Sequence, residues 1–244
     1  MCRLLLSIVI LLVLHTSNAN GKRSLRNKHE EKKPLVVSVI GDSLMERPMR
    51  EFNLFHKIKK YAGGDINFEC FAQGGTMIKG IKENQLKPAL ESLHERSDIQ
   101  HTRVVLMLWD TDISDVDESG KSDHDVASLR QDYKKNLRFV IEGVQKSGAH
   151  LIMGGPILLG EQAAKEETPG PKEKMLDDYR EINMDVAKHY GVKYVDLRKS
   201  YKDKLPDNCN ENSGKLTLDG EHPNNNGAEL TAKGFGDALK KYMH

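Results

Sequence analysis

The sequence predicts an α/β fold, a three-layer α/β/α sandwich with a five-stranded parallel sheet. Two observations predict it. From Leu35 onward, five short apolar runs alternate with longer segments that have helical spacing of apolar residues. Strands separated by helices of this length are joined by crossover connections, which make the strands parallel and put helices on both faces of the sheet. The 244 residues are enough for one domain of ordinary size with a full core.

Five apolar runs are expected to form the strands. Leu35–Ile40 is rich in β-branched residues, which favour a buried strand, and Arg103–Trp109 (RVVLMLW) is the strongest apolar run after it. In chain order, the expected strands are Leu35–Ile40, Ile66–Phe71, Arg103–Trp109, Leu151–Gly155 and Val192–Leu197.

Helices are expected between these strands. Apolar residues recur at helical spacing in Met45–Tyr61, and Gly63 and Gly64 end that segment. The other expected helices are Ile81–Leu93, Val126–Ser147, Glu173–Tyr190 and a last one from near Asn225 to near Tyr242. The expected loops are Asp110–Asp125, Leu158–Lys172 and Ser200–Leu218. The charge of the second loop favours a solvated connection, with a mobile lid as the alternative.

The N-terminal segment resembles a secretory signal peptide. Arg3 precedes the apolar run Leu4–Leu14, and the small residues of Ser17–Ala19 follow as a cleavage signal. The run is shorter than the ~20 residues that a membrane span needs, although an uncleaved anchor is the alternative. We expect a signal peptide over residues 1–19, a flexible basic leader over 20–34 and one domain over 35–244. The expected location is extracellular or in the secretory or lysosomal lumen, with no stable membrane span after cleavage.

Ser43 is the first candidate for chemistry. The strand Leu35–Ile40 ends in Gly41-Asp42-Ser43, and the residues that follow are expected to be helical. A strand-to-helix turn holds a side chain at the carboxyl edge of the sheet, where open α/β folds bind ligands. It also leaves free N–H groups that can meet a developing negative charge. The simpler interpretation of Ser43 is a helix N-cap.

Asp219 and His222 are the partners that a nucleophilic serine would need. A serine hydroxyl is a weak nucleophile without an adjacent base, and histidine is suited to that task near neutral pH. A carboxylate three residues before the histidine can hold its other ring nitrogen. Asp219 could instead form an Asx-turn, and His222 could cap the last helix.

Together these residues resemble the GDSL or SGNH hydrolase family. The match lies in Ile40-Gly41-Asp42-Ser43-Leu44 and in Asp219-x-x-His222-Pro223, and it covers nearly all of the chain after Lys33. The resemblance implies a flavodoxin-like sandwich, with Ser43 as the nucleophile and Asp219 and His222 as the other triad members. It also implies a backbone N–H donor to the oxyanion, which corresponds to Gly74, with Gly75 as the alternative register.

One block of the chain departs from that family. The family usually carries Gly-x-Asn-Asp after its third strand, where this chain has Trp109-Asp110-Thr111-Asp112. Thr111 stands in place of the asparagine, so the resemblance implies that Thr111 is an oxyanion donor with a shorter reach. Loss of one such donor costs an enzyme about 10²–10³ in turnover. Trp109 is a candidate substrate-binding platform, although core packing is the commoner role of tryptophan.

The leading hypothesis is a secreted serine esterase that cleaves carboxylic esters through an acyl-enzyme. Ser43 attacks, His222 transfers the proton, Asp219 orients the imidazole, and the N–H groups of Ser43 and Gly74 bind the oxyanion. The substrate would be a small-molecule, lipid or acylated-glycan ester. Two alternatives remain: a weakened SGNH-like module that binds a glycan or acyl ligand, and an O-acyltransferase that uses the same serine.

Several other functions are not expected. The formal net charge of +1 gives no field that would attract nucleic acid. No zinc-ligand spacing or phosphate-binding glycine loop is present, so no metal and no cofactor are expected. The acidic loop Asp110–Asp125 lacks the order of an EF-hand. After loss of Cys2 with the signal peptide, Cys70 and Cys209 could pair in an oxidising compartment or remain two free thiols.

Overall fold

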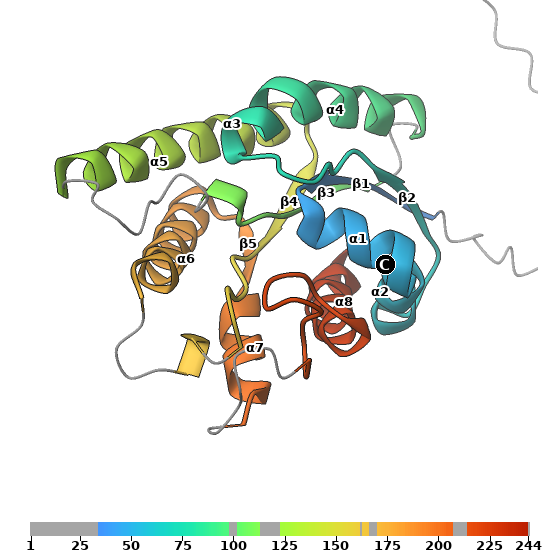
Figure 1. Cartoon of the computed structure of the whole chain (residues 1–244). Helices are drawn as coiled ribbons and strands as arrows, with labels where there is room; N and C mark the ends of the chain where they lie inside the picture. Colours follow the sequence, from blue (N-terminus) through green and yellow to red (C-terminus); the bar gives the residue numbers. More distant parts are fainter. Residues whose placement is uncertain are drawn as a thin grey trace, which may run out of the picture. The chain divides into compact units, whose positions relative to one another are not determined.

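The computed structural model describes residues 34–97, 102–112, 123–161, 163–165, 170–206 and 214–243. Within these residues the chain forms a five-stranded sheet in the order β2-β1-β3-β4-β5, and every neighbouring pair is parallel (Figure 1). The strands are β1 (Leu35–Gly41), β2 (Ile66–Cys70), β3 (Arg103–Leu108), β4 (His150–Gly154) and β5 (Lys193–Val195). The predicted α/β fold with five parallel strands is therefore confirmed.

Helices cover both faces of the sheet. One hydrophobic cluster joins the sheet to α1 (Ser43–Phe52), α2 (Leu54–Ala62), α7 (Leu197–Lys204) and α8 (Asn225–Leu239). A second cluster joins it to α3 (Ile78–Gly80), the π-helical turn η1 (Ile81–Gln85), α4 (Leu86–Glu95), α5 (Asp123–Lys146) and α6 (Pro171–Tyr190). Two short 3₁₀ helices complete the described elements: η3 (Ala163–Lys165) and η4 (Lys240–Tyr242).

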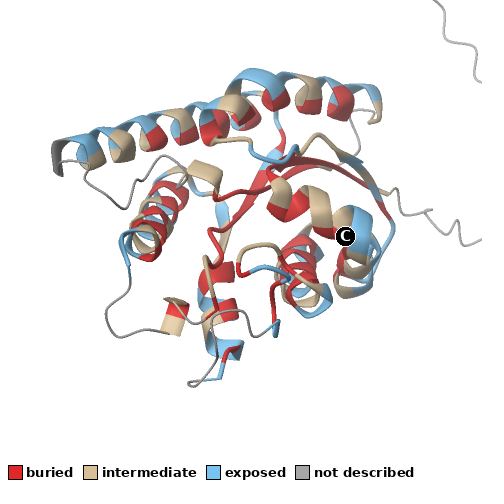
Figure 2. Cartoon of the chain, in the orientation of Figure 1, coloured by how far each residue is buried: buried red, intermediate tan, exposed pale blue. Residues whose placement is uncertain are grey.

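The two clusters follow from the alternation of side chains along each strand. Val37 and Val39 of β1 lie in the cluster of α1 and α8, whereas Val36 and Ile40 lie in the cluster of α4 and α5. All of β1 is buried, as the sheet in Figure 2 shows. Complete burial of such a side chain contributes about 1.5–3 kcal/mol, so the central strands anchor the domain.

The segment expected as one helix, Met45–Tyr61, is two helices. Asn53 separates α1 from α2 and has a left-handed backbone with φ of 54°. Asparagine tolerates this conformation better than most residues, and it ends a helix by turning the chain. The segment expected as Ile81–Leu93 is likewise longer and divided into α3, η1 and α4.

The prediction of a loop over Ser200–Leu218 is wrong at its start, because α7 extends from Leu197 to Lys204. Asp196 caps this helix by accepting the N–H of Lys199. The sequence of α7 is mostly charged, which hides its apolar side, but Leu197 and Tyr201 are fully buried. The short apolar side explains why the helix was not predicted.

The pairing of α2 with α8 joins an early part of the chain to its C-terminal end. Glu229 of α8 accepts hydrogen bonds from Lys57 and Tyr61 of α2. At Gly236 a Cβ atom would lie 2.4 Å from the Cβ of Tyr61 and 3.0 Å from the carbonyl oxygen of Ile58. A glycine is therefore needed for this close approach of the two helices.

Several sequence-based expectations lie outside the described residues. They are the signal peptide over residues 1–19, nearly all of the leader over 20–34, and Cys209. Cys70 is a free, partly buried thiol, and its burial raises its pKa. In the part of the chain that the structure describes, no helix is both long and apolar enough to span a membrane.

Candidate active site

Ser43, His222 and Asp219 lie together in the structure. Nε2 of His222 is 3.0 Å from Oγ of Ser43, and Nδ1 of His222 is 2.9 Å from Oδ2 of Asp219. Both distances are within hydrogen-bond range. An ionised Asp219 can only accept, so Nδ1 carries the proton and the lone pair of Nε2 faces the serine hydroxyl. The arrangement can therefore take a proton from Ser43 and pass it to a leaving group.

The turn between β1 and α1 presents the Ser43 hydroxyl. Asp42, not Ser43, caps the helix, because its Oδ1 accepts the N–H of Leu44 at 2.9 Å. Gly41 is clamped by the buried amide of Gln85, which accepts its N–H and donates to its carbonyl oxygen. A Cβ at Gly41 would lie 2.0 Å from the carbonyl oxygen of Leu108, so only glycine fits beside β3. The serine hydroxyl is thus left for His222.

A buried glutamate holds the loop that carries Asp219 and His222. Oε1 of Glu161 accepts the N–H groups of Leu216 and Thr217 at 2.7 Å and the hydroxyl of Thr217 at 2.9 Å. Close by, the N–H of Gly160 donates to the carbonyl oxygen of Gly220 at 2.7 Å. The expected loop Leu158–Lys172 is therefore not a solvated connection or a lid at its start, because Leu158 and Glu161 are fully buried.

Asp219 is held in its charged form. Its partial burial acts to raise its pKa, but hydrogen bonds from the backbone and ring of His222 and from the N–H of Glu221 lower the pKa to about 2. Arg47 of α1 adds an ion pair at 3.2 Å. The carboxylate can therefore stabilise an imidazolium on His222 without taking its proton.

We expect Asp219→Asn to destabilise the protein at neutral pH and to have less effect in acid. A carboxyl whose pKa is lower in the folded state than the unfolded value of about 3.9 stabilises the fold above about pH 4. That stabilisation is lost as the pH falls from about 4 to about 2. Because the side chain is 47% exposed, solvent screening limits the effect to about 1 kcal/mol. Urea unfolding at neutral and acid pH measures it, and equal destabilisation at both would contradict the expectation.

Gly74 lies beside Ser43, in the loop after β2. A Cβ at Gly74 would be 3.7 Å from the Cβ of Ser43, whereas one at Gly75 would meet nothing within 4 Å. The N–H of Gly74 donates to Oε2 of Glu46 at 2.7 Å. Among the described residues, no acceptor meets the N–H of Ser43. Two backbone N–H groups thus lie close to the serine, and one of them already binds a carboxylate.

Thr111 has a different role from the one expected. Its hydroxyl donates to Oδ2 of Asp42 at 2.7 Å, and its N–H donates to the same oxygen at 3.0 Å. A hydroxyl has one hydrogen to donate, so Thr111 cannot also donate to an oxyanion in this arrangement. The oxyanion role of Thr111 is therefore corrected to one of tying the end of β3 to the turn before Ser43.

Trp109 is also placed differently from the substrate platform that was considered. Trp109 is only 1% exposed, and its ring stacks on that of Tyr133 of α5, with the ring centroids 6.2 Å apart. The residue continues the alternation of β3, in which Val105 and Met107 face the same hydrophobic cluster. A substrate cannot stack on a side chain that is buried in this way, so the substrate-binding role is wrong and core packing is observed.

Two buried carboxyls, Asp42 and Asp110, follow neighbouring strands. Burial, then the charges of Asp42 and Glu221, raise the pKa of Asp110 well above its usual value. Burial also raises the pKa of Asp42, but its hydrogen bonds oppose this. Asp42 accepts four hydrogen bonds, and no hydrogen bond to the Asp110 carboxyl exists among the described residues. We therefore assign the negative charge to Asp42 and the proton to Asp110.

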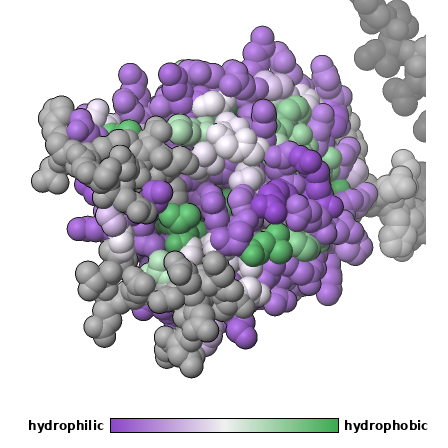
Figure 3. Space-filling model, viewed as in Figure 1, coloured by the Kyte–Doolittle hydropathy of each residue, from purple (hydrophilic) through white to green (hydrophobic). Residues whose placement is uncertain are grey.

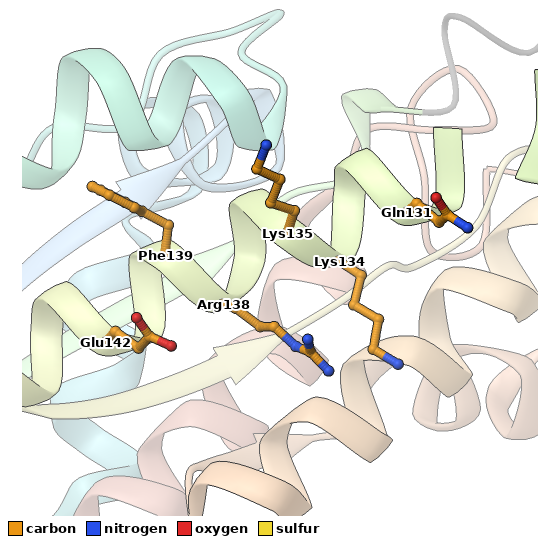
Figure 4. A pocket seen from close by; sticks show the side chains of 6 residues that line it. All are labelled: Gln131, Lys134, Lys135, Arg138, Phe139 and Glu142. Carbon is orange, nitrogen blue, oxygen red and sulfur yellow. The ribbon is translucent and has the colours of Figure 1, made fainter. Parts of the chain in front are cut away.

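The face of the molecule in Figure 3 is mostly hydrophilic, with small hydrophobic areas. A shallow groove of about 430 Å³ lies along α5, and Figure 4 shows the side chains that line it: Gln131, Lys134, Lys135, Arg138, Phe139 and Glu142. It contains no triad residue. Leu218, directly before Asp219, is 47% exposed and offers an apolar surface near the triad. Within the described ranges, no group of three or more acidic, histidine or cysteine side chains is arranged to hold a metal ion.

Three residues of the site were not identified from the sequence: Glu46, Arg47 and Glu161. Glu46 and Arg47 follow Ser43 by three and four positions, the spacing that puts side chains on one face of a helix. This spacing was a usable signal. Glu161 had no such signal, because its partners Leu216 and Thr217 are far away in the sequence.

The described strands form a fully parallel α/β sandwich, and Ser43, His222 and Asp219 lie together at one edge of its sheet. Solved structures share this fold. The acetyl xylan esterase AlAXEase superposes with a TM-score of 0.63 at 20% identity, covering 84% of this chain and 100% of its own. The acetylxylan esterase Axe2 from Geobacillus stearothermophilus gives 0.62 at 14% identity, covering 84% and 94%. A protein from Parabacteroides merdae, described as a putative GDSL-like lipase, gives 0.62 at 16% identity, covering 85% and 97%.

This chain therefore has the fold of the SGNH hydrolases, as the resemblance in its sequence implied. Two further Axe2 structures are described as catalytic mutants, one with a histidine and one with a serine replaced by alanine. No protein-family model and no curated protein matches the sequence. The likeness at these identities concerns the fold, and a fold alone does not determine chemistry.

Proposed function

We propose that this protein is a serine esterase that hydrolyses carboxylic esters. The observation that carries the proposal is the chain of hydrogen bonds from Ser43 through His222 to Asp219. Ser43 attacks the ester carbonyl while His222 takes its proton, and the tetrahedral oxyanion is met by the N–H groups of Ser43 and Gly74. His222 then protonates the leaving alcohol. Water attacks the acyl-enzyme with His222 as the base, which releases the acid and the free serine.

The fold comparisons support an ester substrate, since the matched proteins include two acetylxylan esterases. A panel of esters tests the proposal: p-nitrophenyl esters of increasing acyl length, an acetylated xylo-oligosaccharide and a lysophospholipid. We expect hydrolysis of at least the short-chain esters, and no hydrolysis above background by Ser43→Ala as the negative control. Labelling of Ser43 by a fluorophosphonate without turnover would instead favour the acyltransferase. No labelling of the folded protein would favour a binding module.

We propose secretion from the N-terminal sequence, in which the apolar run Leu4–Leu14 is followed by small residues. Expression of the full chain in a secreting eukaryotic cell tests this. The protein in the medium should begin near Asn20, as read by N-terminal sequencing. An intact N-terminus that stays with the membrane fraction would contradict it.

We expect Glu161→Ala to slow ester hydrolysis by misplacing the loop of Asp219 and His222. The substitution removes the acceptor of the Leu216, Thr217 and Lys215 N–H groups. A displacement of about 1 Å at a catalytic group costs about 10²-fold in rate. Glu161→Gln keeps one acceptor oxygen and should recover most of kcat/KM. The low-field proton resonance of His222 Nδ1 reports its bond to Asp219, and an unchanged resonance and rate in Glu161→Ala would refute this role.

A further inference from the structure

Glu46 binds the backbone N–H that the proposed mechanism needs for the oxyanion. Its Oε2 accepts the N–H of Gly74 at 2.7 Å, and its Oε1 forms an ion pair with Arg50 one turn later in α1. The side chain of Glu46 is only 20% exposed, whereas that of Arg50 is 65% exposed. The carboxylate is therefore held in the site from two sides, by a backbone donor and by a guanidinium.

The carboxylate lies beside Gly74, which in turn lies beside Ser43. An atom in the Cβ position of Gly74 would be 3.2 Å from Oε2 of Glu46 and 3.7 Å from the Cβ of Ser43. A carboxylate oxygen carries part of a negative charge, as the oxygen of a tetrahedral intermediate does, and both are bound by the same kind of N–H donor. In the structure, the donor that would receive the reacting oxygen is already taken.

We propose that Glu46 is a resident anion of the oxyanion hole, which has to leave the Gly74 N–H before an ester can react. The inference rests on the proposed esterase function and adds to it a self-blocking side chain. Glu46 can leave without losing both partners, because Arg50 lies on the same helix face and remains available. The N–H of Ser43, which no described acceptor meets, stays open in both arrangements.

Two consequences follow from competition for one N–H group. Removal of the carboxylate should speed acylation, because no resident acceptor then has to be displaced. It should also make the enzyme more sensitive to small carboxylates such as acetate, which can enter the vacated position. A hydrogen bond to a charged group is strong enough for a change of about tenfold in each.

Kinetics give the first test. We expect Glu46→Ala to raise both kcat/KM for p-nitrophenyl acetate and the rate of fluorophosphonate labelling of Ser43 about tenfold, and to lower the inhibition constant of acetate by a similar factor. Glu46→Gln keeps a neutral acceptor and should fall between wild type and Glu46→Ala. Glu91→Ala removes a helical glutamate that pairs with Lys87 on α4, and it should leave all three quantities unchanged.

A spectroscopic test does not depend on turnover. The amide proton of Gly74 should resonate at low field in the wild type, move to higher field in Glu46→Ala, and return on addition of acetate to that variant alone. An unmoved Gly74 amide, or an active wild type that Glu46→Ala does not accelerate, would overturn the inference and leave the esterase proposal standing. Absence of labelling and hydrolysis in both proteins would overturn the esterase proposal, and the inference with it.

Discussion

Ser43→Ala is expected to lower kcat/KM for p-nitrophenyl acetate by at least about 10⁴-fold, the largest loss of any single substitution. The reason is geometric. Oγ of Ser43 is 3.0 Å from Nε2 of His222, and alanine has no hydroxyl to attack the carbonyl. His222→Ala should cost nearly as much, because the hydroxyl then lacks a base. The double variant should be no worse than either single one, since the two residues act as a unit.

The fold should survive this change. The helix cap of α1 is Asp42, so loss of the Ser43 hydroxyl removes no capping bond and should shift the urea midpoint little. Ser200→Ala, which removes an exposed hydroxyl that bonds to the carbonyl of Asp196, serves as the control and should keep wild-type activity. If Ser43→Ala hydrolysed the ester at the wild-type rate, the mechanism proposed for this protein would be wrong.

Arg198→Met is expected to cost about 3–5 kcal/mol in free energy of unfolding, the largest loss of stability. Arg198 is fully buried and binds the carboxylates of Glu173 and Asp177. It also donates to the carbonyl oxygen of Ile157 at 2.6 Å. Without the guanidinium, the carboxylate of Glu173, whose side chain is 3% exposed, would be left buried without a counter-charge.

Urea unfolding measures this effect against two comparisons. Lys199→Ala removes an exposed ion pair with Asp203 on the same helix and should cost less than about 1 kcal/mol. Arg198→Met combined with Glu173→Gln removes the buried charge as well, and it should be more stable than Arg198→Met alone. A loss below about 1 kcal/mol in Arg198→Met, or no recovery in the double variant, would contradict this account.

The sequence allowed prediction of the sheet and of the three residues that meet at its edge. Apolar runs separated by helices imply parallel strands, and the carboxyl ends of parallel strands share one edge. Ser43 follows β1, an inner strand of the sheet, so its position at that edge was predictable. The motif of Asp219 and His222 was informative because its spacing suits a turn that brings both side chains to one side.

The neighbours of the triad were harder to predict. The role of Thr111 depends on the pairing of β1 with β3, which sets Gly41 opposite Leu108 and so brings Thr111 to Asp42. The role of Glu46 depends on a loop after another strand, β2, which carries Gly74. Helical spacing puts Glu46 on the same helix face as Ser43, but its contact with Gly74 and that of Thr111 with Asp42 join distant segments, and local propensity and spacing do not predict such contacts. By contrast, the position of Trp109 was predictable, because the alternation of side chains along β3 puts it on the same face as Val105 and Met107, in the hydrophobic core.

The pairing of α2 with α8 bears on when the protein can act. Ser43 and His222 are 179 positions apart, and α8, which begins just after His222, must dock on α2 to bring the ends of the domain together. A chain in which α8 has not yet docked on α2 has the serine but lacks the folded segment that positions His222 beside it. The proposed ester cleavage would thus begin only after this late, long-range docking step.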